Sequence, residues 1–340
     1  MVTFFRLFAV SLVMFGLVTN AFAAEVNVYS ARKENLIKPL LDKFSLDTGI
    51  KTNLITAKAD KLLTRMKNEG RNTPADILIT TDAGRLYRAK QAGLLQAFES
   101  EAISKRVPAH LRDIDGLWVG LSQRARVLFY AKDRVKPEQL SSYENLADAG
   151  WHRRICIRGS SNIYNQSMVA SMIAAIGETA TLEWSKGLVK NLARKPKGGD
   201  RDQIKAAAAG QCDVAVANTY YYAKMLANNK DPAQVEAAKK MAIFWPNQND
   251  RGAHVNVSGA GISKYSKNKE NAVRLLEFLL SAESQQWYAS VNYEYPVVEG
   301  VGLNGVVADW GDFKSDLLNL SQLGELNATA VKIMDKAGWQ

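Results

Sequence analysis

Short apolar segments of strand length alternate with amphipathic helical segments from Glu25 onward. In the first part of the chain, the segments with strand character are residues 26–30, 50–55 and 77–79. Between them, apolar residues recur at helical spacing in residues 36–44, 60–68 and 85–91. Strands that alternate with helices usually form a parallel sheet, so this part predicts an α/β fold with a mostly parallel sheet.

The middle and the end of the chain repeat the alternation. Further strands are predicted at residues 127–130, 155–157, 213–217, 242–245 and 257–262. Helices are predicted from about Tyr164, around residues 183–192 and over residues 269–280. The chain exceeds the length that a single core usually covers, which favours two domains. Two sheets built from non-contiguous segments would suit a hinged binding protein.

The N-terminus has the order of a secretory signal. Arg6 is followed by an uncharged apolar run over residues 7–18 and by small residues at 21–23. The run is too short to span a bilayer, so we expect residues 1–23 to be a signal peptide that is removed before Ala24. A buried core helix is the alternative. No later segment is apolar for long enough to form a transmembrane helix, which predicts an exported, soluble protein.

The charge of the chain argues against a nucleic-acid-binding protein. The whole chain has 44 Lys and Arg against 34 Asp and Glu, and without Arg6 the excess is nine positive charges. In the sequence these charges are scattered rather than gathered into a stripe, and an exported protein rarely meets DNA.

Two cysteines, Cys156 and Cys212, lie in short apolar segments. In an oxidising compartment such a pair is most simply a disulfide, and two buried thiols are the alternative.

Tyrosines stand at two predicted strand-to-helix turns. Tyr220, Tyr221 and Tyr222 follow the strand at 213–217, and Tyr164 opens a helix for which Ser161 or Asn162 is the expected cap. Ligands of open α/β sheets collect at such turns. Neighbouring residues on a helix point in different directions, so one tyrosine of the triplet can pack inward while the others face a cleft.

Several phenols in one cleft suit a hard, highly charged cation. Three phenolates would balance the charge of a ferric ion, and the metal must drive their ionisation because free tyrosine has a pKa of about 10. A small anion such as carbonate could fill remaining coordination positions. Arg124 and Arg126 lie on one strand face and could hold that anion, or they could be ordinary surface charges. Aromatic clusters also line sugar and quaternary-amine sites.

The sequence also resembles a known family, the bacterial periplasmic ferric-ion-binding proteins of ABC transporters, which are related in fold to the transferrin lobes. The likeness runs from Val26 to at least Ser315, and it is carried by residues 26–30, 74–76, 124–127, 191–196, 198–203 and 220–222. The resemblance implies a two-lobe α/β periplasmic binding protein fold, with a mixed sheet in each lobe and iron in a hinged cleft. We expect the first lobe to comprise residues 24–124 and 248–300, and the second lobe residues 125–247 and 301–340.

The resemblance also implies a ligand set. Tyr164, Tyr220 and Tyr221 match the phenolate ligands of the family, and Arg124 matches the arginine that supports a carbonate in some members. The implied partner is the permease of an ABC importer in the inner membrane, which a monomeric protein would supply from the periplasm.

The sequence departs from the family at two turns. Many relatives have a histidine after the first strand, where this chain has Arg32, Lys33 and Glu34, and some have a glutamate ligand near the position of Asp82. The chain therefore looks like the subgroup with three tyrosines and an anion. Glu34 and Asp82 remain possible additional ligands, with solvated surface or capping carboxylates as the alternative. His110, His152 and His254 match no ligand position.

Two other functions compete with ferric binding. A binding protein for an organic cation such as thiamine or a polyamine could use Trp118, Trp245 and Asp82, but this interpretation leaves the tyrosine triplet without a role. An exported enzyme is disfavoured, because the sequence has no nucleophile elbow, zinc-protease motif or phosphate-binding loop.

Overall fold

The structure is a computed structural model that describes residues 24–303 and 305–340, so the predicted signal peptide at residues 1–23 lies outside the described residues. The strands are β1 (Glu25–Ser30), β2 (Lys51–Thr56), β3 (Ile77–Thr81), β4 (Leu95–Gln96), β5 (Val119–Ala131), β6 (Ile155–Cys156), β7 (Val214–Asn218), β8 (Met241–Phe244) and β9 (Val255–Ser263). The helices are α1 (Lys38–Thr48), α2 (Ala59–Glu69), α3 (Ala83–Gln91), α4 (Glu101–Arg106), α5 (Ile163–Lys190), α6 (Asp200–Ala208), α7 (Thr219–Leu226), α8 (Pro232–Lys239), α9 (Lys269–Leu279), α10 (Ala282–Trp287), α11 (Ser321–Glu325) and α12 (Asn327–Lys336).

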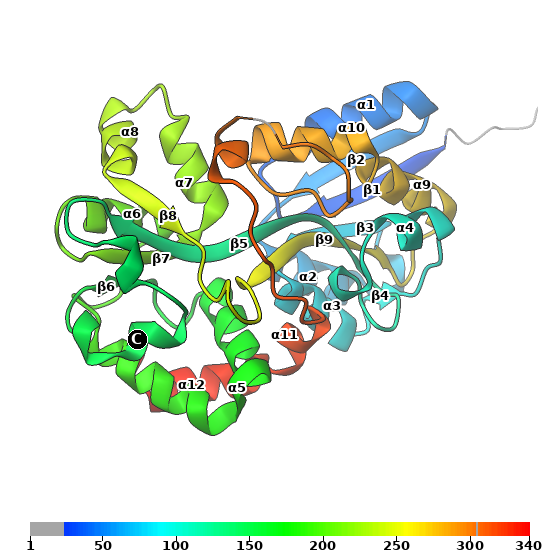
Figure 1. Ribbon diagram of the computed structural model, residues 1–340. Helices are drawn as coiled ribbons and strands as arrows, with labels where there is room; N and C mark the ends of the chain where they lie inside the picture. Colours follow the sequence, from blue (N-terminus) through cyan, green and yellow to red (C-terminus); the bar gives the residue numbers. More distant parts are fainter. Residues whose placement is uncertain (1–23, 304) are drawn as a thin grey trace, which may run out of the picture.

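The strands form two mixed sheets that share β5 (Figure 1). In the first sheet, β1 pairs in parallel with β2 and β3, which confirms the parallel arrangement predicted for this part of the chain. The strand β9 then runs antiparallel to β3 and to the first part of β5. In the second sheet, β7 is antiparallel to β5 and parallel to β6, and β8 lies on the other edge of β5.

Strand β5 changes partners in the middle of its length. Residues 119–125 pair with β9, whereas residues 126–130 pair with β7. The strand is longer than the predicted segment 127–130. The prediction was too short because the first part of the strand includes the polar residues Ser122, Gln123 and Arg124. These side chains interrupt the apolar pattern in the sequence, yet they are buried in the fold.

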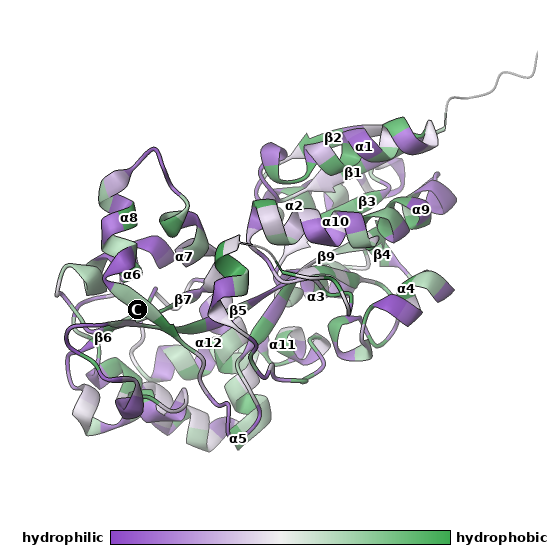
Figure 2. Ribbon diagram, turned by 45° about the horizontal axis from the view of Figure 1, so that its top comes forward, coloured by the Kyte–Doolittle hydropathy of each residue, from purple (hydrophilic) through white to green (hydrophobic). Residues whose placement is uncertain are grey.

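Helices cover the sheets on their outer faces (Figure 2), and they bury apolar residues such as Leu40 and Phe44 of α1 and Leu276 of α9. The segment labelled α5 contains two helices joined at a kink, as predicted from Tyr164 and around residues 183–192. The helix is interrupted within its length by Gly177, which has a φ of 80°. A glycine adopts this left-handed conformation at little cost, so the chain bends there and helix resumes.

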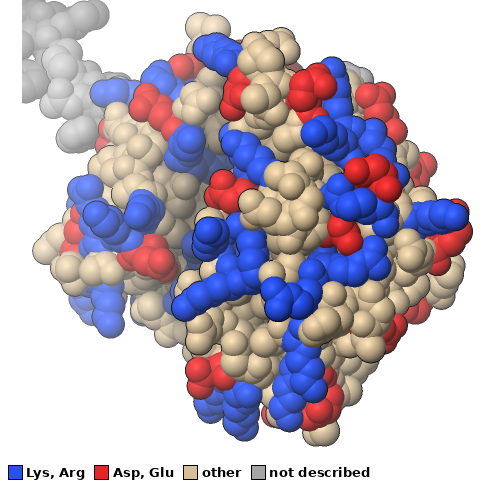
Figure 3. All heavy atoms as spheres, turned by 90° about the vertical axis from the view of Figure 1, so that its left-hand side faces the viewer, with Lys and Arg blue, Asp and Glu red and all other residues tan. Residues whose placement is uncertain are grey.

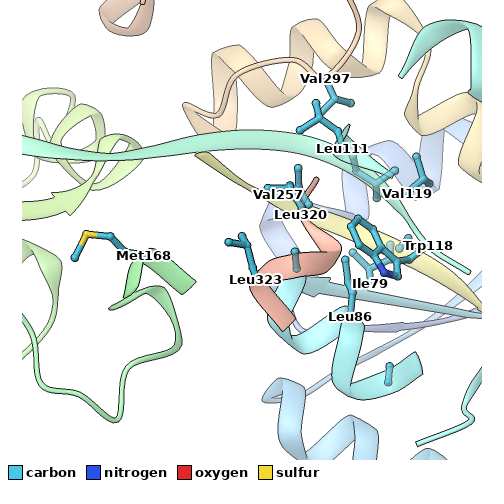
Figure 4. Close-up of a cluster of buried hydrophobic side chains, with 14 of the residues drawn as sticks. Ile79, Leu86, Leu111, Trp118, Val119, Met168, Val257, Val297, Leu320 and Leu323 are labelled. Carbon is cyan, nitrogen blue, oxygen red and sulfur yellow. The ribbon is translucent and has the colours of Figure 1, made fainter. Parts of the chain in front are cut away.

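One apolar cluster in the first sheet combines residues from distant parts of the sequence (Figure 4). Ile79 of β3 and Val257 of β9 lie near Leu86 of α3 and Leu323 of α11. Helix α11 also packs against α5, and α12 packs along α5, so the C-terminal helices contact elements of both sheets. Within residues 24–303 and 305–340, no helix is both long enough and apolar enough to cross a membrane.

Candidate metal and anion site

Two parallel strands deliver the tyrosine-bearing turns to the same edge of the second sheet. Ile155 of β6 lies beside Val214 of β7, and both strands run toward the turns that carry Tyr164 and Tyr220. Cys156 and Cys212 form a disulfide with a Cα–Cα distance of 5.9 Å, as predicted. This disulfide links the segments that lead into the two turns.

The predicted tyrosines are brought together. The hydroxyl oxygens of Tyr164 and Tyr220 lie 3.4 Å apart, and the ring centroids of Tyr220 and Tyr221 are separated by 4.3 Å. The side chain of Asn162 caps α5 by accepting a hydrogen bond from the Tyr164 amide, so the expected cap is confirmed. Asn218 occupies the corresponding position before α7.

The third tyrosine of the triplet points away from this cluster. Tyr222 is buried, and its hydroxyl donates hydrogen bonds to the carbonyl oxygens of Ala238 and Met241. Its ring packs against Phe129 on one side and stacks on Trp310 on another. Tyr222 therefore anchors α7 to the second sheet.

The phenols of Tyr220 and Tyr221 are held in their protonated form in the absence of a cation. Burial, followed by the nearby Tyr164, Tyr221 and Asp200, raises the pKa of Tyr220 well above its usual value, although Arg124 opposes this shift. Burial, followed by Tyr164 and Asp200, raises the pKa of Tyr221 to about 12, although Tyr220 and Arg158 oppose this shift. A cation placed among the phenols would reverse this effect.

Arg124 lies beside the tyrosine cluster without a hydrogen-bond partner. Its side chain is 2% exposed, and its guanidinium carbon is 5.5 Å from the centroid of the Tyr164 ring. A carboxylate oxygen of Asp82 is 3.5 Å away, but neither terminal nitrogen of Arg124 makes a hydrogen bond to any described residue. Buried donors are normally satisfied, so these nitrogens have the capacity to bind an anion.

Arg126 contributes to the same small hollow but is engaged differently. The hollow is lined by Asp82, Arg124, Arg126, Tyr164, Asn218, His254 and Asn256. The terminal nitrogens of Arg126 donate to Asp200, Asn218 and Asn165. Both arginines are buried, so the alternative that they are surface charges is wrong.

The two possible additional carboxylates have different positions. Glu34 is exposed. Asp82 is fully buried and caps α3 by accepting a hydrogen bond from the Gly84 amide at 3.0 Å. Its carboxylate also accepts hydrogen bonds from Ser167 at 2.7 Å and from Asn256 at 3.0 Å. These bonds occupy both oxygens, so Asp82 has the capping role that the sequence offered as its alternative.

A second charged cluster near Tyr220 was not anticipated from the sequence. Arg32 forms a buried ion pair with Glu294, and Ser122 donates a hydrogen bond to the same carboxylate. Burial would raise the pKa of Glu294, but Arg32 and Ser122 outweigh it and the pKa is lowered. Glu294 gave no signal in the sequence, because it lies 262 residues from Arg32.

Lys224 places another cation next to the tyrosines. Its ammonium nitrogen is 5.3 Å from the centroid of the Tyr220 ring, one helical turn away along α7. Burial lowers the pKa of Lys224 to about 8, with Glu294 opposing this and Arg32 and Arg201 adding to it. Helical spacing from Tyr220 is the sequence signal that could have identified this residue.

Of the three histidines, only His254 lines the hollow. It is buried, and burial together with Arg126 and Arg124 lowers its pKa to about 3. His254 is therefore neutral at physiological pH. Among the described residues, no group of three or more His, Cys, Asp or Glu could hold a metal ion, which leaves the tyrosines as the principal candidate donors.

The residues suggested for an organic cation are not brought together. Trp118 is buried in the core of the first sheet, and Trp245 stacks on Phe313 at a centroid distance of 4.0 Å. Neither tryptophan lines the hollow that contains Asp82.

The outer side of the second sheet is basic. On the face formed around α6 and α8, Lys and Arg side chains are more frequent than Asp and Glu (Figure 3). Residues 125–247 have 18 Lys and Arg against 11 Asp and Glu, so the positive charge is less evenly scattered than the sequence suggested. Such a surface attracts anions.

Known proteins share both the sequence and the fold. Residues 72–309 match the family described as bacterial extracellular solute-binding protein. The chain is 51% identical to iron uptake protein A1 of Synechocystis over 93% of its length and 88% of the relative. It is 31% identical to the major ferric iron-binding protein of Neisseria meningitidis, with 81% of each chain covered.

A solved structure of Trichodesmium IdiA (FutA), in complex with iron and citrate, has a TM-score of 0.91 at 48% identity. The aligned region covers 93% of this chain and 100% of the Trichodesmium chain. The two-lobe α/β fold is thereby confirmed, and so is the expectation of a non-enzymatic class, because the named relatives are iron uptake and ferric-binding proteins. The chain belongs to the bacterial extracellular solute-binding proteins and, within them, is similar to iron uptake and ferric-ion-binding members.

Proposed function

We propose that this protein binds ferric iron through the phenolates of Tyr164, Tyr220 and Tyr221, together with a small anion held by Arg124. The observation that carries the proposal is the 3.4 Å separation of the Tyr164 and Tyr220 hydroxyl oxygens, with Tyr221 beside them. Phenolate oxygens at this separation repel each other unless a cation lies between them. A trivalent ion matches the charge of three phenolates.

The charges around the tyrosines support binding of an anion. Cationic side chains outnumber carboxylates around the cluster. Arg32, Arg124, Arg126, Arg158 and Lys224 lie there with Asp82, Asp200 and Glu294. Ferric iron and three phenolates add no net charge, so an excess of positive charge remains. Carbonate would offset part of this excess, and the two free nitrogens of Arg124 match its planar oxygens.

The relatives favour the same cargo. The relative from Neisseria is named a ferric iron-binding protein, and the Trichodesmium structure contains iron and citrate. Citrate is a polycarboxylate, which agrees with a site that needs anionic oxygen donors besides tyrosines. In the absence of citrate, we infer that carbonate or another small anion takes this place.

The proposed transport role follows from membership of the family. The protein would collect iron in the periplasm as a monomer and deliver it to the permease of an ABC importer in the inner membrane. We propose that one lobe comprises residues 24–124 and 248–300, and the other residues 125–247 and 301–340. The change of partners along β5 between residues 125 and 126 supports this division.

An organic cation is the weaker candidate ligand. Thiamine and polyamines are positively charged, and the cluster already has an excess of positive charge. A site for such ligands would require free carboxylates, whereas Asp82, Asp200 and Glu294 are each hydrogen-bonded or ion-paired. The charge balance therefore favours a ligand that brings anionic groups with it.

Colour provides the test. Ferric ion added with bicarbonate to the iron-free protein should produce an orange to red colour, through charge transfer from phenolate to iron, and should raise the melting temperature. Thiamine and spermidine should leave both unchanged. The proposal fails if the protein stays colourless and its melting temperature does not respond to iron.

A further inference from the structure

Arg126 occupies the centre of the region between the two tyrosine-bearing turns. It lies on β5 directly opposite Asn218, the last residue of β7, and its side chain is 2% exposed. Arg124 lies two residues earlier on the same strand, and its terminal nitrogens have no hydrogen-bond partner among the described residues. The two arginines therefore differ in what they can bind.

The guanidinium of Arg126 contacts both turns at once. One terminal nitrogen donates to the side-chain oxygen of Asn165 at 2.6 Å, and the other donates to that of Asn218 at 3.0 Å. Asn165 directly follows Tyr164, and Asn218 precedes Tyr220 by two residues. A single planar group therefore fixes the distance between the backbones that carry the two phenols.

Asp200 completes this arrangement. Its carboxylate is fully buried and accepts hydrogen bonds from Arg126 at 3.0 Å and from the backbone amide of Asn218 at 2.8 Å. On the other side, the amide group of Asn165 donates to the carbonyl oxygens of Arg158 and Gly159, in the turn before Tyr164. In each turn, hydrogen bonds therefore reach both a backbone group and the side chain of the asparagine that Arg126 contacts.

The strands alone provide little to fix the two turns relative to each other. The ladder between β6 and β7 consists of two residue pairs, Ile155 with Val214 and Cys156 with Ala215. A ladder of two pairs leaves the turns beyond it without direct backbone pairing. The disulfide holds the strands before the turns, so a second link is needed close to the phenols.

We propose that Arg126 is a positioning residue, which holds Tyr164 and the Tyr220–Tyr221 pair at the separation required to bind one metal ion. Its terminal nitrogens are committed to Asp200, Asn218 and Asn165, and only its Nε lacks a partner, so it cannot offer an anion the two terminal nitrogens that Arg124 offers. Arg124 is the arginine that binds the anion. This inference rests on the proposed ferric function. It assigns positioning of the tyrosines to Arg126 and binding of the anion to Arg124.

The test compares Arg126→Gln and Arg126→Lys with Arg124→Gln. Iron affinity is measured by competition with a chelator at several bicarbonate concentrations, and the wavelength of the charge-transfer band is recorded. Both Arg126 variants should lose about 10- to 100-fold in iron affinity even at saturating bicarbonate, as expected for loss of an outer partner of the metal ligands. Their band should shift, because the oxygen positions change. Lysine should not rescue the function, because an ammonium group cannot contact the three acceptors in one plane.

The bicarbonate dependence separates the two roles. Arg124→Gln should require more bicarbonate for half-maximal binding, whereas the Arg126 variants should keep the wild-type midpoint. The inference is overturned if the midpoint of the Arg126 variants rises and saturating bicarbonate restores their affinity, because Arg126 would then bind the anion. Unchanged affinity and an unchanged band would overturn it as well.

Controls cover stability and folding. Lys90→Gln removes the partly buried ion pairs with Asp113 and Asp115, away from the tyrosines, and should leave the band in place while lowering the melting temperature. If the Arg126 variants do not fold, Asn165→Ser and Asn218→Ser each remove one acceptor of Arg126, and an unchanged band in both would overturn the inference. If the wild-type protein binds no iron, the proposed function itself fails, which is a distinct outcome.

Discussion

The hydroxyl oxygens of Tyr164 and Tyr220 lie 3.4 Å apart, although 56 residues separate them in the chain. The two tyrosines come from turns after parallel strands, and their oxygens are close enough to bind one ion. Without a cation, this proximity contributes to the raised pKa of Tyr220. The same arrangement that disfavours ionisation in the empty protein favours it once a metal ion lies between the oxygens.

Substitution of the tyrosines should separate ligands from packing residues. Tyr220→Phe and Tyr221→Phe should each weaken ferric binding by at least about 100-fold, the upper end of what loss of an outer partner costs. Tyr222→Phe should bind iron normally and lose about 1 kcal/mol of stability, because its hydroxyl bonds only backbone carbonyls. Chelator competition and urea unfolding measure the two effects. Equal losses of affinity at all three positions would mean that the assigned ligands are wrong.

Iron binding should be strongly dependent on pH. The pKa values of Tyr220 and Tyr221 are raised, so both phenols are protonated at neutral pH and must release protons to the solvent when iron binds. Each released proton lowers the apparent affinity by about tenfold for every unit that the pH falls, so coordination by the three proposed phenolates gives about 1000-fold per unit. Chelator competition between pH 8 and pH 6 measures the slope. A slope of tenfold per unit or less would show that only one phenol ionises.

His254 should make the iron-free protein sensitive to acid. The unfolded chain binds a proton at this residue near pH 6.5, whereas the folded protein does so only near its pKa of about 3. The unfolded state therefore binds more protons between these values, and stability is lost as the pH falls through this range. At pH 5 the loss amounts to about 2 kcal/mol relative to neutral pH.

The variant His254→Gln removes this contribution. Urea unfolding at pH 7 and pH 5 should show that the variant loses about 2 kcal/mol less than the wild-type protein on acidification. If the two proteins lose the same free energy, His254 is already protonated in the fold or is accessible to solvent at pH 5.

Loss of the disulfide should destabilise the second sheet. Cys156 and Cys212 are 56 residues apart, and a cross-link closing a loop of this size contributes about 4 kcal/mol in the chain-entropy model. The variant Cys156→Ala/Cys212→Ala should therefore unfold at lower urea concentration, and reduced wild-type protein should behave like it. An unchanged unfolding midpoint would show that β6 and β7 are held by other contacts.

The elements of the fold could be predicted where apolar residues recur regularly. The helix over Lys38–Thr48 buries Leu40, Leu41 and Phe44, in agreement with their spacing in the sequence. The first part of β5 could not be predicted in this way, because its buried polar side chains belong to the site. The apolar pattern thus fails at the positions that the proposed function needs most.

The site could be predicted as far as its residues lie in recognisable turns. The tyrosines and the cap Asn162 are local features, and the structure places the tyrosines together. The ion pair between Arg32 and Glu294 joins distant parts of the chain and depends on tertiary packing. The contrast between Arg124 and Arg126 likewise required the positions of Asn165 and Asp200, which neighbour them only in space.

Because β5 changes partners between Ala125 and Arg126, a rotation of one sheet relative to the other would twist this strand. Arg124 would turn with the first sheet, while Arg126 and the phenols would stay with the second. Opening would therefore withdraw the guanidinium that holds the anion from the phenols without any change of side-chain rotamer. If the proposed lobes rotate, β5 would be one of the segments that transmit their movement to the anion and to the coordination of the metal.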